Sequence, residues 1–156
     1  MYKKILVPID GSPTSNLGLN EAIKLAKDQG AKLRLFHLVD EYYAVSSSDI
    51  ASSADDLIEA LRQGGKKILE KAETLARRDG LTPESVMIES FGGRAADFIV
   101  QQAKKWGADL IVLGTHGRRG AKRLVMGSDA EQVVRTTRVP VLLVRSKATP
   151  RASRKP

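Results

Sequence analysis

The sequence predicts an α/β domain with a five-stranded parallel sheet covered by helices on both faces, a Rossmann-like architecture. Three observations support this prediction. Five short apolar segments alternate along the chain with four segments of helical character. The apolar segments are continuous rather than alternating with polar residues, which is typical of strands buried on both faces. Glycine and serine punctuate the junctions, where helices begin and end.

The length and composition fit one domain without disulfides or structural metal. The 156 residues contain no cysteine, which excludes thiol catalysis and cysteine metal sites. The first apolar run is too short for a signal peptide, and no run approaches the ~18 residues of a membrane span. We therefore expect a soluble cytoplasmic protein.

Positive charge is concentrated in two places. The net charge is +8, and residues 145–156 contribute five cations and no acid. A second cluster comprises Arg118, Arg119, Lys122 and Arg123. Aromatic residues make up only 4% of the chain, whereas nucleic-acid readers commonly pair basic faces with aromatic stacking residues. Nucleic acid is therefore not the expected partner.

The first half of the chain predicts two strands and two helices. Residues 4–9 form a short apolar strand, Ser12 is a good helix N-cap, and Pro13 suits the first helical position. Gly30 ends this helix, and residues 32–39 form the second strand. Residues 40–54 are polar and rich in serine, so we expect a mobile loop. A long helix follows from about residue 57 to Gly80.

Gly64 and Gly65 lie inside this long helix and weaken it by up to ~1 kcal/mol each relative to alanine. They mark either a kink or a close packing contact.

The second half predicts three strands and two helices. Strands are expected at residues 86–89, 109–113 and 141–144, with helices over residues 94–106 and from Ser128 to about residue 137. Gly107 closes the earlier of these helices, and Phe98 and Trp106 have the spacing of packing residues. We assign residues 1–145 to one domain and residues 146–156 to a disordered basic tail.

The strongest chemical signal is the glycine-rich segment between the fourth strand and the last helix. Gly114 and Gly117 are followed, after nine residues, by Gly127 and Ser128. Glycines permit positive φ and close approach to a ligand, and successive amides can form an anion-binding concavity. The following helix N-terminus adds free N–H groups. With four nearby cations, this segment suits a polyphosphate.

Each element of this site has a second interpretation. Any one glycine is explained by a turn alone, whereas three glycines, a serine and four cations together favour phosphate binding. Ser128 either caps its helix or donates to a phosphate, and His116 either touches a phosphate or shapes the turn. His37, within the second strand, is interpreted as a core histidine. Two distant histidines make no convincing metal site.

The chain resembles the universal stress protein family over about residues 1–145. The matching segments are KKILVPIDGS at 3–12, FHLVD at 36–40 and ADLIVLGTHGRRGAKRLVMGSDAEQVVRTTRVPVLLV at 108–144. The nucleotide-binding branch of that family has the signature Gly-x2-Gly-x9-Gly-Ser/Thr, which is complete here at Gly114, Gly117, Gly127 and Ser128. The resemblance therefore implies the ATP-binding branch.

The resemblance also implies the strand order 3-2-1-4-5 and the other half of the site. Ligands of open α/β sheets lie beyond the carboxyl ends of strands, where the strand order reverses. Asp10 there either accepts hydrogen bonds from ribose hydroxyls or serves as a turn or capping residue. The expected nucleotide contacts are Pro8, Asp10, Val39, Leu113, Gly114, His116, Gly117, Arg118, Arg119, Gly120, Gly127, Ser128 and Asp129, with Val39 reaching adenine through its backbone. Mg²⁺ is expected to arrive with ATP, held largely by phosphate oxygens and water.

The sequence shows no catalytic set that supports efficient turnover. Phosphoryl transfer needs a positioned nucleophile, metal and charge clamp, and no general base is evident beyond His116 or Asp129. Three hypotheses remain: an ATP-binding regulatory or protective stress protein with little or no hydrolysis, a slow ATP hydrolase or nucleotidyl-transfer enzyme, and a structural dimer that holds no nucleotide.

The last strand suggests an assembly surface. Its residues Val141, Leu142, Leu143 and Val144 are all apolar, and the implied strand order places them at an edge of the sheet. Exposed apolar edges pair readily with other strands. Members of the resembled family commonly dimerise through this strand, so we expect a two-fold homodimer.

Overall fold

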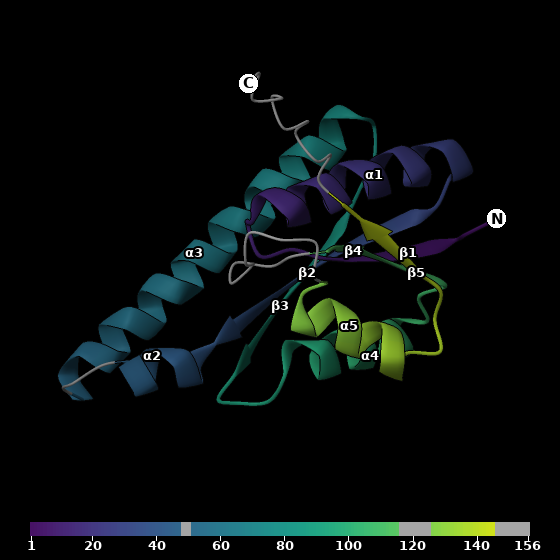
Figure 1. Cartoon of the computed structure of the whole chain (residues 1–156). Coiled ribbons are helices and arrows are strands. Elements are labelled where there is room, and N and C mark those ends of the chain that lie inside the picture. The colour runs from purple at the N-terminus through teal and green to yellow at the C-terminus, as the bar shows by residue number, and fades with distance from the viewer. Residues whose placement is uncertain (48–50, 116–125, 146–156) are drawn as a thin grey trace, which may run out of the picture.

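The structure is a computed structural model, and it describes residues 1–47, 51–115 and 126–145. Five parallel strands form one sheet in the order β3-β2-β1-β4-β5, which confirms the expected fold class and strand order. Figure 1 shows the sheet between two helical layers, with α1 and α3 on one face and α4 and α5 on the other. The elements in chain order are β1 (Lys4–Pro8), α1 (Pro13–Gln29), β2 (Lys32–Asp40), α2 (Glu41–Ser47), α3 (Ala51–Arg78), β3 (Glu84–Ser90), α4 (Ala95–Trp106), β4 (Leu110–Gly114), α5 (Ser128–Thr136) and β5 (Val141–Val144).

Alternate residues of the central strands pack into two separate cores. Ile5 and Val7 of β1 face α1 and α3, while Leu6 between them faces α4 and α5. All three side chains are fully buried. Burial on both faces explains why these strands are continuously apolar in sequence.

The caps of α1 follow the sequence prediction. The Ser12 hydroxyl accepts a hydrogen bond from the Ser15 amide at 3.2 Å, and Pro13 occupies the first helical position. Gly30 ends the helix with a φ of 64°, a left-handed conformation that glycine adopts without a Cβ penalty. These contacts fix where the chain leaves β1 and enters α1.

The expectation of a loop over residues 40–54 is wrong in the described part of that segment, while the mobility expected for it stays a prediction. Residues 41–47 form the helix α2, and α3 begins at Ala51 rather than near residue 57. An ion pair between Glu41 and Arg62 of α3 and a ring contact between Tyr42 and Phe91 join α2 to its neighbours. These tertiary contacts override the weak helical pattern of the local sequence.

In the part of the chain that the structure describes, none of the helices combines the length and the apolar character of a membrane span.

Gly65 marks a close packing contact within α3. A Cβ atom at this position would lie 2.7 Å from the His37 ring and 3.0 Å from the Met87 sulfur. A Cβ atom on Gly64 would meet nothing within 4 Å. The glycine at position 65 therefore lets α3 lie directly on β2 and β3, which confirms the packing alternative for this residue.

Candidate site at the carboxyl edge of β1 and β4

The candidate site lies where the order of the sheet reverses. β1 is paired with β2 on one side and with β4 on the other. The helix that follows β1, α1, and the helix that follows β4, α5, pack on opposite faces of the sheet. Crevices at such points bind ligands in open α/β folds. β1 ends at Pro8 and β4 ends at Gly114, so the segments that follow them, with Asp10 and with Thr115, lie at the same edge.

Asp10 shapes the turn between β1 and α1. Its Oδ1 atom accepts a hydrogen bond from the Ser12 amide at 2.9 Å, a side-chain-to-backbone contact that closes an Asx turn. Gly11 between them has a φ of 79°, which favours glycine. The turn role of Asp10 is therefore confirmed, while its role toward ribose stays a prediction. The half-buried carboxylate lies at the edge where the ribose is expected.

Gly114 is required by packing against α1. A Cβ atom here would lie 2.5 Å from the Thr14 carbonyl carbon and 2.8 Å from the Ser15 nitrogen. Gly18 completes the contact from the helix side, because its own Cβ would approach the Gly114 nitrogen to 3.1 Å. Gly114 does not have the positive φ that the motif led us to expect. A packing role for this glycine is thus supported. Gly114 lets the first turn of α1 lie against the end of β4.

One backbone hydrogen bond joins the ends of the glycine-rich segment, and a second anchors the first end to β5. The Thr115 amide donates to the Val144 carbonyl at 3.0 Å, and the Gly127 amide donates to the Thr115 carbonyl at 2.7 Å. Residues 115 and 127 are therefore neighbours in space, although eleven positions separate them in the sequence. The predicted contacts His116, Gly117, Arg118, Arg119 and Gly120 lie outside the described residues.

The start of α5 differs from the expectation in one respect. Gly127 is the N-cap, with φ −60° and ψ 148°, and Ser128 is the first helical residue. The expectation that Ser128 caps the helix is wrong, because the cap position falls one residue earlier and no side chain caps this end. Gly127 has backbone angles that any L-residue can adopt, so no positive φ requires it. Ser128 and Asp129 are exposed at this edge.

Sequence reasoning missed Thr115, which is 5% exposed, donates its amide to Val144 and accepts from the Gly127 amide. Its position directly after Gly114 was the available signal. The structure also places Val39, with an exposure of 2%, near the end of β2, one strand away from β1. Four of the predicted contacts thus lie together: Pro8, Asp10, Leu113 and Gly114. Thr115 joins Gly127–Asp129 to this group, and Val39 lies beside it.

His37 is a core residue, as predicted. Its side chain is 5% exposed, and its Nδ1 atom lies 2.7 Å from the Ile9 carbonyl oxygen. Among the described residues, no group of three or more histidine, aspartate or glutamate side chains is arranged to hold a metal ion.

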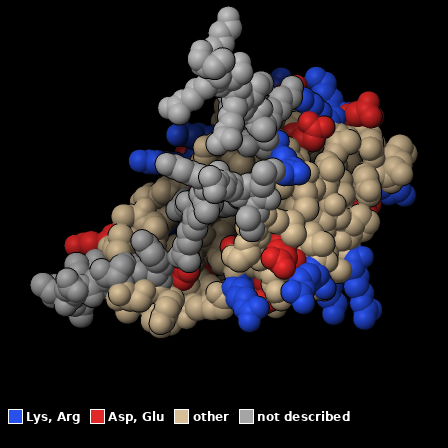
Figure 2. Space-filling view, viewed as in Figure 1, with Lys and Arg blue, Asp and Glu red and all other residues tan. Residues whose placement is uncertain are grey.

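In the view of Figure 2, lysine, arginine and acidic side chains are interspersed around the rim of the described surface.

Comparison with known proteins identifies the family. The model of the universal stress protein family matches residues 1–145. The chain is 37% identical over 146 residues to universal stress protein MJ0531 of Methanocaldococcus jannaschii, covering 93% of this chain and 83% of that protein. It is 36% identical over 151 residues to universal stress protein YxiE of Bacillus subtilis, covering 93% and 100%. The chain belongs to the universal stress protein family.

Solved structures show the same fold. The structure of hypothetical protein MJ0577 superposes with a TM-score of 0.81 at 28% identity, covering 96% of this chain and 99% of that one. A universal stress protein in complex with cAMP gives 0.69 at 25% identity, with 94% and 99% covered. The universal stress protein of Archaeoglobus fulgidus in complex with dAMP gives 0.65 at 26% identity, with 92% and 98% covered.

Proposed function

We propose that this chain is an ATP-binding universal stress protein that acts as a nucleotide-dependent regulatory or protective factor in the cytoplasm, with little or no intrinsic hydrolysis. The observation that carries the proposal is the closure of the glycine-rich segment at the edge of β4. The Gly127 amide donates to the Thr115 carbonyl and holds the two ends together, while the Thr115 amide donates to Val144 of β5. Gly114, next to Thr115, lies against the first turn of α1, which follows the Asp10 turn. The complete spacing of Gly114, Gly117, Gly127 and Ser128 spans this closure.

The proposed ligand is an adenine nucleotide with a polyphosphate chain. Two related structures of the family contain cAMP and dAMP, which supports recognition of adenine nucleotides by this fold. The four cations of residues 118–123 favour a more highly charged ligand than a monophosphate, because each added phosphate increases the electrostatic attraction.

We assign the parts of ATP to the edge as follows. The phosphates lie along residues 114–119 and against Gly127 and Ser128, where the first-turn amides of α5 have no acceptor within the helix. The ribose hydroxyls donate to Asp10, and adenine is read by the backbone of Val39. Mg²⁺ enters with the phosphates. The exposed Asp129, in the first turn of α5, is the acid that directly follows Ser128 in the sequence.

Calorimetry with Mg-ATP on a Gly127 series tests the proposal. Gly127→Ala and Gly127→Val keep the observed backbone angles, so they add side-chain volume without backbone strain. We expect micromolar binding by the parent chain and a graded loss that reaches about tenfold or more for valine, equivalent to ~1.4 kcal/mol.

Gly64→Ala is the matched control, because a Cβ there meets no other atom within 4 Å. It should bind ATP as the parent chain does. Circular dichroism must show intact folding of all variants. A parent chain without ATP affinity, or a Gly127→Val variant with unchanged affinity, would refute the proposal. Steady phosphate release from Mg-ATP by the parent chain would instead favour the alternative function, a slow ATP hydrolase.

The proposed assembly is a homodimer through residues Val141–Val144. β5 has β4 as its strand neighbour, and its position at the end of the strand order leaves its other side at the sheet edge. The carbonyls of Pro140 and Val144 bond to β4, so the backbone groups of Val141 and Leu143 point to the open edge. These outward groups supply the hydrogen bonds of the proposed pairing.

A further inference from the structure

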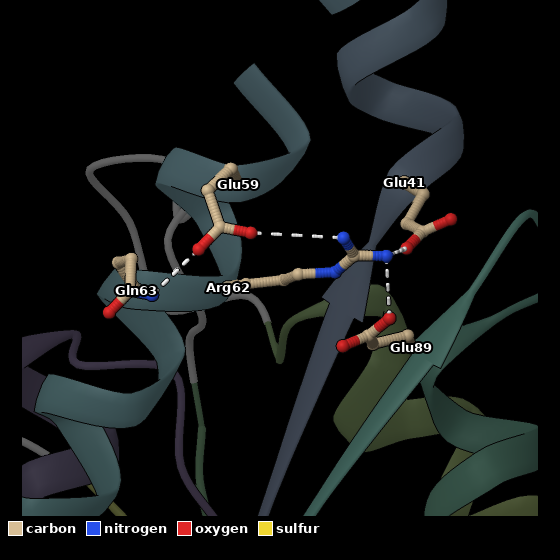
Figure 3. Close-up of polar contacts among 5 residues, drawn as sticks. All are labelled: Glu41, Glu59, Arg62, Gln63 and Glu89. Carbon is tan, nitrogen blue, oxygen red and sulfur yellow. Dashed lines mark hydrogen bonds and ion pairs between the residues drawn. The ribbon is translucent and has the colours of Figure 1, made fainter. Parts of the chain in front are cut away.

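Arg62 of α3 links three elements near the carboxyl ends of β2 and β3. Its Nη2 atom lies 2.8 Å from a carboxylate oxygen of Glu41 and 2.8 Å from one of Glu89. Its Nη1 atom lies 3.8 Å from Glu59, one turn earlier in α3. Glu41 is the first residue of α2 and Glu89 lies near the end of β3. Figure 3 shows the guanidinium between these carboxylates.

The cluster depends on the single cation. Hydrogen bonding to Glu89, followed by its charge and by the same contacts from Glu41, raises the pKa of Arg62 above its ordinary value, although burial opposes the shift. The guanidinium therefore stays charged at any pH at which the protein is folded. Without it, the Glu41 and Glu89 carboxylates would face each other as like charges. Arg62 thus overcomes a repulsion that would separate α2 from β3.

One donor of the Arg62 guanidinium is left without a partner among the described residues. Its Nε atom is buried and has no hydrogen-bond partner within the described part of the chain. A buried donor without a partner lowers stability. The contacts of Nη2 to Glu41 and Glu89 are retained in spite of this cost, and they join segments that are separate in the sequence.

The two glutamates bracket Val39, the residue assigned to the adenine base. Glu89 is the register partner of Val39 across the sheet, and Glu41 follows Val39 by two positions. The other contact at this end, between the rings of Tyr42 and Phe91 at 6.1 Å, involves side chains that are 57% and 63% exposed. Such exposed rings bury little apolar area and fix α2 weakly. The ion-pair cluster, by contrast, links α2, α3 and β3 through one guanidinium.

We propose that Arg62 is a positioning residue for the base-binding end of the nucleotide site. It acts through Glu41 and Glu89 to fix the end of β2 and the start of α2, and it does not itself touch the nucleotide. The proposal rests on the proposed function. It assigns to α3 a role in recognition of the base that is separate from phosphate binding at the edge of β4.

Arg62→Met tests this role, because methionine keeps much of the side-chain volume and removes the charge. We expect Mg-ATP affinity to fall by about three- to tenfold, the range of a lost ion-pair cluster converted to affinity. Affinity for inorganic tripolyphosphate, which has no base, should stay the same. Amide hydrogen exchange over residues 38–47 should become faster in the nucleotide-free protein.

Two further variants make the test specific. Arg77→Met is the matched control, since Arg77 lies on the same helix and, among the described residues, forms its ion pair along that helix, with Glu73 at 3.0 Å. This variant should bind ATP as the parent chain does. Arg62→Lys keeps a cation but lacks the planar guanidinium, so its ATP affinity should lie between those of the parent chain and Arg62→Met.

The outcomes separate this proposal from the proposed function. If the parent chain binds ATP and Arg62→Met binds it equally well, Arg62 has no positioning role, whatever happens to amide exchange. Equal losses for ATP and tripolyphosphate would show a general disturbance of the fold and would also overturn it. A parent chain that binds no ATP would refute the proposed function itself. If Arg62→Met fails to fold, the same comparisons apply to Arg62→Lys, whose unchanged ATP affinity and amide exchange would overturn the role.

Discussion

Gly114 lies where the end of β4 touches the first turn of α1, and this contact excludes a Cβ atom. The same residue begins the glycine signature of the nucleotide-binding branch. A glycine in such a motif can therefore serve the scaffold and the ligand together, because a close approach of α1 to β4 also determines the shape of the edge. Gly127 differs, since its backbone angles suit any residue. Substitution of Gly127 is consequently the cleaner test of ligand approach.

Asp10 also combines two roles, and substitutions can separate them. Asp10→Ala removes both the acceptor for the Ser12 amide and the proposed acceptor for ribose. We expect ATP binding to weaken by about 1–3 kcal/mol, the usual range for hydrogen bonds to a charged group. Asp10→Asn keeps an oxygen for the turn and should fall between alanine and the parent chain.

Calorimetry with ATP and with inorganic tripolyphosphate measures the ribose role of Asp10. Tripolyphosphate has no ribose, so its affinity should not change in Asp10→Asn. If both ligands lose the same free energy of binding in this variant, Asp10 acts on the shape of the turn alone.

At the scale of elements, most of the fold was predictable from the sequence. Apolar runs indicated all five strands because each central strand is buried on both faces, and Ser12, Gly30 and Gly107 indicated helix ends through local chemistry. α2 was not predictable, because its contacts come from Arg62 and Phe91, which are distant in the sequence. Thr115 and the Arg62 cluster were missed for the same reason. Their roles depend on which strands and helices lie side by side.

The packing of α3 on β2 and β3 gives a prediction about stability. Gly65→Ala places a methyl group 2.7 Å from the His37 ring and 3.0 Å from the Met87 sulfur. His37 is buried and its ring is held by the Ile9 carbonyl, so it has little freedom to move. We expect the free energy of unfolding to fall by about 1–3 kcal/mol, as in other overpacked cores.

Gly64→Ala, the neighbouring substitution, should have the opposite sign. Its methyl group meets nothing within 4 Å, and alanine favours the helix by roughly 0.5–1 kcal/mol over glycine. Urea denaturation of the two variants and the parent chain measures both effects. Equal stability of Gly64→Ala and Gly65→Ala would contradict the packing described here.

At the scale of the whole molecule, the proposed dimer places β5 of two copies together at the sheet edge. Leu143→Pro removes an outward amide and no hydrogen bond to β4, and proline is tolerated on edge strands. We expect the parent chain to sediment as a dimer at micromolar concentration and Leu143→Pro to sediment as a monomer.

Leu143→Val is the control for this variant, because it shortens the same side chain, which packs against the core beside α4 and α5, but keeps the amide. It should remain dimeric. A monomeric parent chain would rule out the assembly without affecting the proposed nucleotide site. A dimeric, folded Leu143→Pro variant would place the interface elsewhere.

The central claim is that the edge of β1 and β4 holds ATP, with the phosphates on backbone amides and the ribose on the Asp10 carboxylate. Titration of the ¹⁵N-labelled protein with Mg-ATP, followed by amide chemical shifts, tests this claim most directly because the observed groups are the proposed ligands. We predict that the largest shifts occur at residues 10–12, 39, 113–119 and 127–130, with little change along the carboxyl-terminal half of α1. Saturating ATP that leaves these amides unshifted, or shifts confined to other surfaces, would contradict the account.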